Sequence, residues 1–296
     1  MLAALLATTL FALSSVTAKR SVNLLGSTHA NLVRIALATL VLGLWAHLFG
    51  GGWGGSSWGW FVVSGLIGFG ICDTAIFLAL PRLGAQLTSL MVQCLAAPIG
   101  ALVEWLWLGT RLSSHHLAAG ALILGGVAVA LVPNKSGQTR LHSGWVGFAL
   151  GALAAAGQAI GAILSRHGQL LAHERGESLD ALTVAYQRIV AGLAFTCVWW
   201  IWARRHRIGA PPPGPLAVRP AVPWVVLNAL SGPSLGVAAY QWALQLQPSG
   251  IVLAIAALTP LAVIPLAWWI DGERPTARSV SGGILAVGGA VWLALH

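Results

Sequence analysis

Two acidic residues, Asp73 and Glu104, stand inside long apolar stretches of the sequence. A charge in such a stretch is expensive, and it therefore marks a functional candidate. Asp73 lies seven residues before Leu80, which places it about 10 Å from that end of its stretch at 1.5 Å per residue. We expect Asp73 to bind a proton or cation in alternation with a solute, with Glu104, near the other end of its own stretch, as a second candidate. The structural alternative for either acid is a hydrogen bond or a buried ion pair.

Five uncharged polar residues also fall inside apolar stretches. Their amide and hydroxyl groups can orient a polar solute in a cavity, and they are costly to leave facing lipid. The alternative is hydrogen bonding between helices, worth about 1 kcal/mol each. Two of the five are adjacent, about 100° apart around a helix, so both can flank one cavity. The five are Gln93, Gln158, Asn228, Tyr240 and Gln241.

Two prolines and two arginines complete the candidate set. Pro98 and Pro260 interrupt long apolar stretches, and paired interruptions point to a solute site, although each can be an ordinary tolerated kink. Arg34 and Arg188 lie near the start of their stretches, where they can contact an anionic solute group. Snorkelling of both arginines to lipid headgroups is the interpretation that the sequence favours.

The elements that must position these residues are transmembrane helices. Hydrophobic residues make up 57% of the 296 residues and charged residues 8%, against roughly 25% charged in soluble domains. A bilayer core needs about 20 apolar residues per helix. The sequence therefore predicts an all-α integral membrane protein with ten transmembrane helices. Their expected ranges are 2–18, 30–49, 58–80, 84–109, 115–133, 144–164, 179–203, 222–245, 249–270 and 277–295.

An internal repeat divides these helices into two sets of five. At a shift of 162 residues Pro98 aligns with Pro260, and Gly126 aligns with Gly288; a weaker match at 154 pairs Arg34 with Arg188. Five is an odd number, so the second set must cross the membrane in the opposite sense, as in the inverted repeats of many secondary transporters. The predicted units are residues 1–133, a connection at 134–143, and residues 144–296.

The net charge of +9 indicates membrane topology and not nucleic-acid binding, because the basic residues lie between apolar stretches. The positive-inside rule places the odd-numbered connections in the cytoplasm and both termini outside. Most of the 15 tryptophans fall at expected helix ends and are predicted to be interfacial anchors. The basic residues of the odd-numbered connections are Lys19, Arg20, Arg82, Lys135, Arg140, Arg204, Arg205, Arg207, Arg219, Arg274 and Arg278.

The sequence resembles the ten-helix EamA-like transporters of the drug/metabolite transporter superfamily. Arg34 and Arg188 match an arginine that these proteins often carry early in the second helix of each half, whereas Gly109-Thr110 departs from the family's usual Gly-Glu. The resemblance implies ten helices in two halves, export of metabolites, and cytoplasmic termini, which conflicts with the charge count. The segments that carry it are 72–80, 95–98, 108–112, 258–260 and 271–275, followed by a glycine-rich last helix.

The expected function is secondary active transport of small polar or amphipathic metabolites such as amino acids, by alternating access and with possible proton coupling. The alternatives are a flippase for lipids or lipid-linked sugars and, more remotely, an intramembrane enzyme. We expect no enzymatic activity, no cofactor and no metal, because Walker A, Gly-x-Ser-x-Gly and HExxH sequences are absent. The expected partners are a small-molecule substrate and membrane lipids, with no nucleic acid, in a monomer or homodimer of the cell (inner) membrane.

Overall fold

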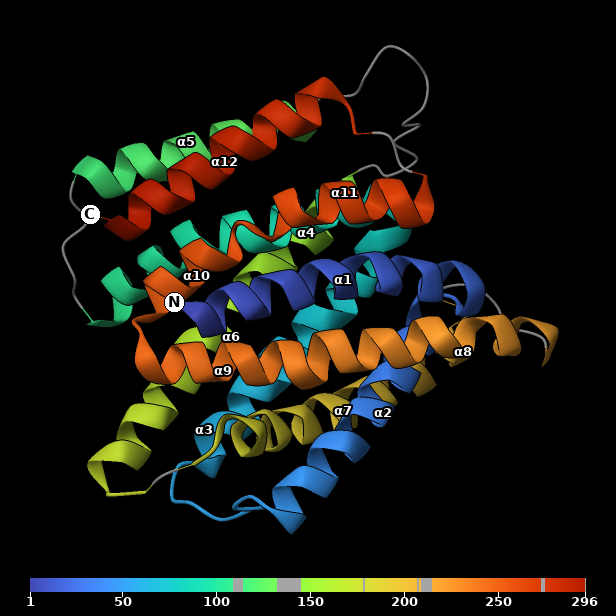
Figure 1. Cartoon of the computed structure of the whole chain (residues 1–296), viewed down its shortest axis with the longest axis vertical. Coiled ribbons are helices and arrows are strands. Elements are labelled where there is room, and N and C mark those ends of the chain that lie inside the picture. Colours follow the sequence, from blue (N-terminus) through green and yellow to red (C-terminus); the bar gives the residue numbers. More distant parts are fainter. Residues whose placement is uncertain are drawn as a thin grey trace.

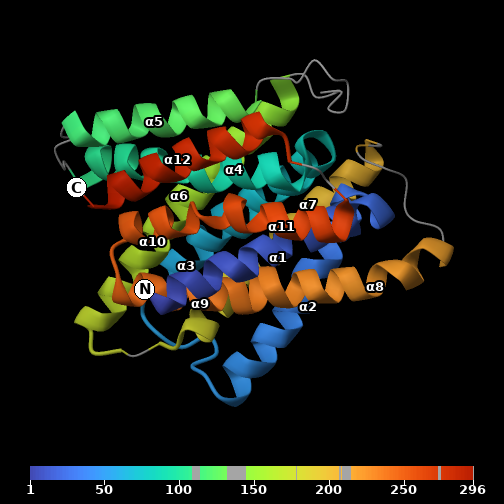
Figure 2. The ribbon, with the colours of Figure 1, turned by 45° about the horizontal axis from the view of Figure 1, so that its top comes forward.

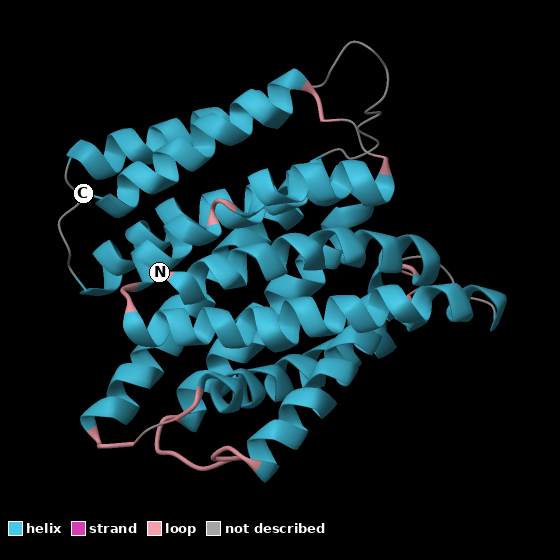
Figure 3. Ribbon diagram, viewed as in Figure 1, coloured by secondary structure: helices cyan, strands magenta, loops and turns pink. Residues whose placement is uncertain are grey.

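The computed structural model describes residues 1–108, 114–131, 145–177, 179–206, 208, 215–272 and 275–295, and every regular element in them is a helix (Figure 3). The elements of the first half are α1 (Leu2–Leu25), α2 (Ser27–Leu48), α3 (Trp58–Gly65), the π-helical segment η1 (Leu66–Cys72), α4 (Asp73–Leu108) and α5 (Ser114–Leu131). Those of the second half are α6 (Trp145–Glu174), α7 (Ala181–Arg205), α8 (Pro215–Ala229), the π-helical segment η2 (Leu230–Ser234), α9 (Leu235–Leu246), α10 (Ser249–Ala256), α11 (Thr259–Asp271) and α12 (Ala277–Leu295).

Seven helical segments of the described chain are long and apolar enough to cross a membrane. The longest, Trp58–Trp107, has 50 residues and joins two of the predicted crossings. Inside it, Gly84 has a φ of 76°, which breaks α4 at the boundary that the sequence predicts. A left-handed φ is open to glycine because it has no Cβ. The count of ten crossings stays a prediction.

Several helices run past their predicted ends. Helix α1 continues to Leu25 and turns at Gly26, whose φ is 77°. The basic residues Lys19 and Arg20 do not stop it, because straight-chain basic residues are good helix formers. The Arg20 guanidinium instead donates to the Ile270 carbonyl in α11. Helix α6 likewise extends to Glu174, ten residues beyond the predicted crossing.

Helices α5 and α12 lie side by side at one edge of the bundle (Figures 1 and 2). Glycines let their backbones approach closely. A Cβ on Gly126 would lie 2.5 Å from the Ala286 nitrogen, and a Cβ on Gly282 would lie 2.4 Å from the Gly126 carbonyl oxygen. Such small-residue contacts are how helices associate in membranes. The last helices of the two halves therefore pack against each other.

Each half also contains one π-helical segment, η1 in the first and η2 in the second. Helix α7 of the second half packs against η1, and helix α2 of the first half packs against η2. In η2, Pro233 has no backbone N–H, which favours the irregular hydrogen bonding. Single π-turns inside α-helices are often found at functional sites. These two segments face the middle of the molecule, where the halves meet.

Candidate ligand-binding cavity

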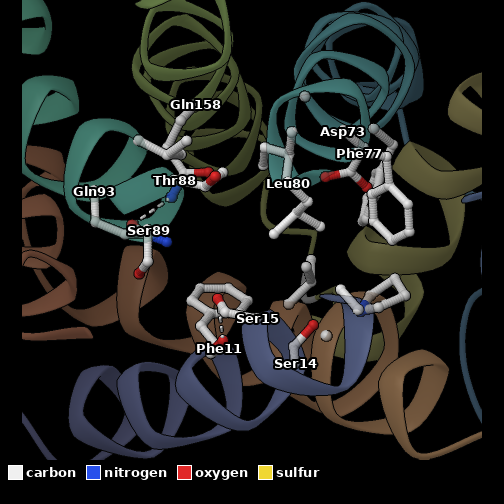
Figure 4. A pocket seen from close by; sticks show the side chains of 18 of the residues that line it. Phe11, Ser14, Ser15, Asp73, Phe77, Leu80, Thr88, Ser89, Gln93 and Gln158 are labelled. Atoms are coloured by element: carbon white, nitrogen blue, oxygen red, sulfur yellow. Dashed lines mark hydrogen bonds between the residues drawn. The ribbon is translucent and has the colours of Figure 1, made fainter. Parts of the chain in front are cut away.

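A cavity of about 110 Å³ lies between the two halves (Figure 4). Its wall combines residues of α1, α2, η1 and α4 from the first half with residues of α6, α7, η2 and α9 from the second. None of its lining residues comes from α5, α10, α11 or α12. The residues are Phe11, Ser14, Ser15, Ala18, Arg34, Gly68, Phe69, Asp73, Ile76, Phe77, Leu80, Ala85, Thr88, Ser89, Val92, Gln93, Gln158, Arg188, Gly232, Pro233, Val237 and Tyr240.

Asp73 forms an ion pair with Arg34 at the cavity wall. Asp73 is the first residue of α4, directly after η1, and its Oδ2 accepts a hydrogen bond from Arg34 Nη2 at 2.5 Å. The Nε of Arg34 donates to Asn31 Oδ1 at 3.1 Å, and its guanidinium carbon lies 4.3 Å from the centre of the Phe77 ring. The charge of Arg34 is thus compensated inside the protein.

Arg188 reaches the same cavity from α7, and its hydrogen-bond partner among the described residues is a neutral hydroxyl. Its Nε donates to Ser64 Oγ at 2.9 Å, and that hydroxyl donates to the Gly161 carbonyl at 2.6 Å. The guanidinium carbon lies 5.5 Å from the centre of the Phe69 ring in η1. No carboxylate of the described residues forms an ion pair with Arg188.

Both arginines are buried, with exposed fractions of 5% for Arg34 and 6% for Arg188. The prediction that they snorkel to lipid headgroups is therefore wrong. Each lies seven residues into its helix, about 10 Å from the helix start at 1.5 Å per residue. Both side chains line the cavity between the halves instead of facing lipid, and a single sequence does not reveal which face of an apolar helix is covered.

Three of the five uncharged candidates line the cavity, namely Gln93, Gln158 and Tyr240. Gln158 Nε2 donates to Gln93 Oε1 at 2.9 Å, which links α6 to α4. The Tyr240 ring packs against Phe11, with the ring centres 5.8 Å apart. Its hydroxyl is buried and has no hydrogen-bond partner within the described part of the chain.

The other two uncharged candidates, Asn228 and Gln241, do not line the cavity. Asn228 Nδ2 donates to the Ser14 carbonyl at 2.6 Å and joins the second half to α1. Gln241 Oε1 accepts from Ser165 Oγ at 2.6 Å and from Gln169 Nε2 at 2.8 Å, which joins α9 to α6. These two amides make the interhelical bonds that were their structural alternative, so Tyr240 and Gln241 do not flank one cavity.

The two candidate prolines also lie away from the cavity. Pro98 stands inside α4, and Pro260 stands in the first turn of α11, after the break that ends α10. The side chain of Glu104 is outside the described part of the structure. The helix interruptions that do line the cavity are η1, through Gly68 and Phe69, and η2. Paired glycines in 66–72 and the Gly-Pro of 230–234 are the signal that sequence reasoning missed.

Two unpartnered hydroxyls and small residues complete the wall. Thr88 and Ser89 are 2% and 5% exposed, and neither hydroxyl has a hydrogen-bond partner in the ranges that the structure describes. Figure 4 shows them beside Gln93 and Gln158, across the cavity from Asp73 and Phe77. Among the described residues, no group of three or more His, Cys, Asp or Glu side chains could hold a metal ion. The cavity is thus charged on one side and neutral and polar on the other.

The sequence profile of the EamA-like transporter family matches residues 1–132 and 145–295, which is most of the chain in two parts. Among solved structures, one crystal structure of a protein superposes with a TM-score of 0.64 at 20% identity, covering 99% of this chain and 96% of that one. This likeness shows that the fold is shared. No curated protein matches the sequence significantly.

Proposed function

Because the chain belongs to the EamA-like transporter family, we propose that it is a secondary active transporter of small polar or amphipathic metabolites, such as amino acids. The observation that carries this proposal is the cavity between the two halves, whose wall is shared by α1, α2, η1 and α4 on one side and α6, α7, η2 and α9 on the other. Transporter sites commonly lie at such repeat interfaces, where interrupted helices meet. A solute bound there would be released to either side as one half rocks against the other.

The membrane arrangement is part of the proposal. Ten crossings in two inverted halves of five fit the break at Gly84 and the pairing of α5 with α12. The start of α1 and the end of α12 lie at the same end of the bundle, as an even number of crossings requires (Figures 1 and 2). We place the protein in the cell (inner) membrane, with the basic odd-numbered connections in the cytoplasm. A reporter fused after His296 that is active only in the cytoplasm would contradict this orientation.

Coupling is assigned to Asp73. Its carboxylate is the acidic group in the cavity wall, and it holds Arg34 in place. A proton bound by Asp73 would remove the negative charge from this pair and free Arg34, so proton binding and solute binding can alternate. Export is the proposed direction. A lipid flippase is less well supported, because a lipid tail needs an apolar wall and this wall carries an ion pair and two amides.

The first experiment is a thermal-shift panel on the purified protein with amino acids, sugars, nucleotides, cationic drugs and small carboxylic acids. A ligand at 100 times its dissociation constant should stabilise the folded state by about 2.7 kcal/mol. We expect a shift confined to one chemical class, and transport of that class in proteoliposomes. The proposal fails if the protein carries no compound of the panel in proteoliposomes.

The coupling assignment needs its own measurement, which is the pH dependence of transport in wild type and Asp73→Asn. The amide has the same shape but cannot bind a proton reversibly, so we expect transport by the variant to lose its dependence on pH. An Asp73→Asn variant that transports with an unchanged pH profile would show that the coupling proton binds elsewhere.

A further inference from the structure

The charges in the cavity wall do not balance. Of the lining residues, Arg34 and Arg188 are cationic and Asp73 is anionic. Counting these groups in their usual ionisation states at pH 7 leaves one positive charge in excess. A buried charge is costly unless an opposite charge compensates it. An anion that enters the cavity would supply that compensation.

The excess belongs to Arg188 and not to Arg34. The guanidinium of Arg34 is used by Asp73 and Asn31, and its flat face lies over Phe77. Arg188 uses its Nε for the neutral Ser64 hydroxyl, and no described acceptor binds its two terminal nitrogens. A guanidinium fork binds a carboxylate through two parallel hydrogen bonds. The free end of Arg188 offers that fork.

The packing around Arg188 keeps the side chain in this position. A Cβ on Gly65, the last residue of α3, would lie 1.9 Å from the Arg188 carbonyl oxygen, so α3 and α7 touch at their backbones there. A Cβ on Gly68 would lie 3.0 Å from Nη2 of Arg188. Arg188 as a whole residue is only 6% exposed. It is therefore held at the cavity wall and not free to reach the membrane surface.

The other polar groups of the cavity wall are neutral and unsatisfied. Thr88 and Ser89 lie across the cavity from Asp73 (Figure 4), and Tyr240 lies on α9, which packs against α7. The hydroxyls of all three are buried without partners in the described residues, although each has hydrogen-bonding capacity. Phe11 and Val92 add apolar surface to the same cavity. A ligand that fits both walls carries one anionic group and a neutral remainder with apolar and hydrogen-bonding parts.

From these observations we infer that the cavity binds a small organic monoanion, whose single carboxylate is held by Arg188 and whose neutral tail lies toward Thr88 and Ser89, within reach of the Tyr240 hydroxyl. This inference rests on the proposed function and narrows its substrate class, from small polar metabolites such as amino acids to those that carry a single net negative charge. One excess positive charge matches a carboxylate. A dianion would leave a negative charge uncompensated, and a cation would add to the charge of Arg188.

The test uses one carbon skeleton in four charge states, with the full chain purified in nanodiscs. The probes are 2-hydroxyisocaproate as the monoanion, its amide as the neutral form, leucinol as the cation and leucine as the zwitterion, with inorganic phosphate beside them. A hydrogen-bonded charge pair is worth roughly ten- to a hundredfold in affinity. We expect the hydroxy acid to bind about tenfold or more tightly than each of the other four.

Two variants assign the effect to one residue. Arg188→Gln should bind the hydroxy acid and its amide with about equal affinity, because only the charge pair distinguishes them. The matched control is Arg175→Gln, which removes an exposed arginine at the end of α6 and should leave the preference intact. Arg188→Lys keeps the charge without the fork, so it should bind more weakly but keep the preference for the anion.

Equal or tighter binding of leucine would overturn the inference, because an ammonium group would then be recognised as well. Failure of all five probes to bind, or an unchanged preference in a folded Arg188→Gln, would also overturn it. Flux measured in proteoliposomes distinguishes a failure of the anion inference from a failure of the transport proposal. If the wild type carries leucinol or the amide and Arg188→Gln carries them equally well, the anion inference fails alone. If the hydroxy acid binds at Arg188 but nothing is carried, the transport proposal fails.

Discussion

Arg34 and Arg188 stand at matching places in the two halves, but their surroundings differ. Both lie seven residues into the second helix of their half, both are buried, and both lie near a phenylalanine ring. Arg34 has a carboxylate partner at 2.5 Å, whereas Arg188 has a serine hydroxyl at 2.9 Å. The same scaffold therefore holds one cation in direct contact with a carboxylate and one cation without such a contact among the described residues.

The difference comes from the residue that follows each π-helical segment. Asp73 follows η1, but Leu235 follows η2 and is 51% exposed. An acid is thus present in one half and missing from the corresponding place in the other. Two halves with identical side chains would give both arginines the same role. Divergence at this position leaves the cavity with one arginine in an ion pair and one arginine without a carboxylate partner among the described residues.

The largest loss of stability is expected from a substitution that displaces the backbone of Arg188. Gly65→Ala would place a Cβ 1.9 Å from the Arg188 carbonyl oxygen, and neither backbone can give way easily. Overpacking a core costs typically 1–3 kcal/mol and more when backbone must shift, so we expect a loss of about 3 kcal/mol or more, measured by thermal unfolding in detergent. Gly59→Ala is the control, because its Cβ meets nothing within 4 Å. Equal stability of the two variants would contradict the close contact.

The sequence predicts most of the architecture. The length and composition of the apolar stretches indicate membrane helices. The break near residue 84 is predicted from the end of one apolar stretch and the start of the next. The helix ends are less well predicted, because Lys19 and Arg20 look like a connection but continue α1. Helix α1 ends at Gly26, because this glycine is the first strong stop signal along the helix.

The site is only partly predictable. Intramembrane charge identifies Asp73, and the pattern of polar residues includes Gln93 and Gln158, all of which line the cavity. Tertiary packing determines which face of each helix meets the other half. The sequence alone therefore does not distinguish Gln241 and Asn228 from the residues that line the cavity. The same reason hides the burial of Arg188. The hydroxyls of Thr88 and Ser89 carry no sequence signal, since such residues are common inside membrane helices.

A second effect, of comparable size, is expected at the paired arginine. Arg34→Met leaves Asp73, whose side chain is 15% exposed, without its partner, and breaking a buried ion pair costs up to about 3–5 kcal/mol. The double variant Arg34→Met/Asp73→Leu removes both charges and should recover most of this loss. Thermal unfolding of the wild type, the single and the double variant measures the coupling. A double variant no more stable than the single one would show that the pair is not the source of the cost.

The unpaired arginine should behave differently in the same assay. Arg188→Met removes a buried charge without leaving a carboxylate behind, so we expect the free energy of unfolding to change by no more than about 1 kcal/mol, or to rise. Ligand binding should be lost at the same time. A stability loss as large as that of Arg34→Met would mean that Arg188 has an anionic partner within the protein, which would end the contrast between the two halves.

The smallest stability effect is expected at Tyr240, and it separates ligand-binding groups from structural ones. Tyr240→Phe removes a buried hydroxyl that has no described partner, so the unfolding free energy should stay the same or rise by up to about 1 kcal/mol. Asn228→Ala, in contrast, leaves the Ser14 groups without their donor and should cost about 1–3 kcal/mol. Binding should show the opposite order, because only Tyr240 lines the cavity. If Tyr240→Phe lowers stability but leaves binding of the hydroxy acid unchanged, the hydroxyl belongs to the scaffold and the neutral wall of the cavity must be reassigned.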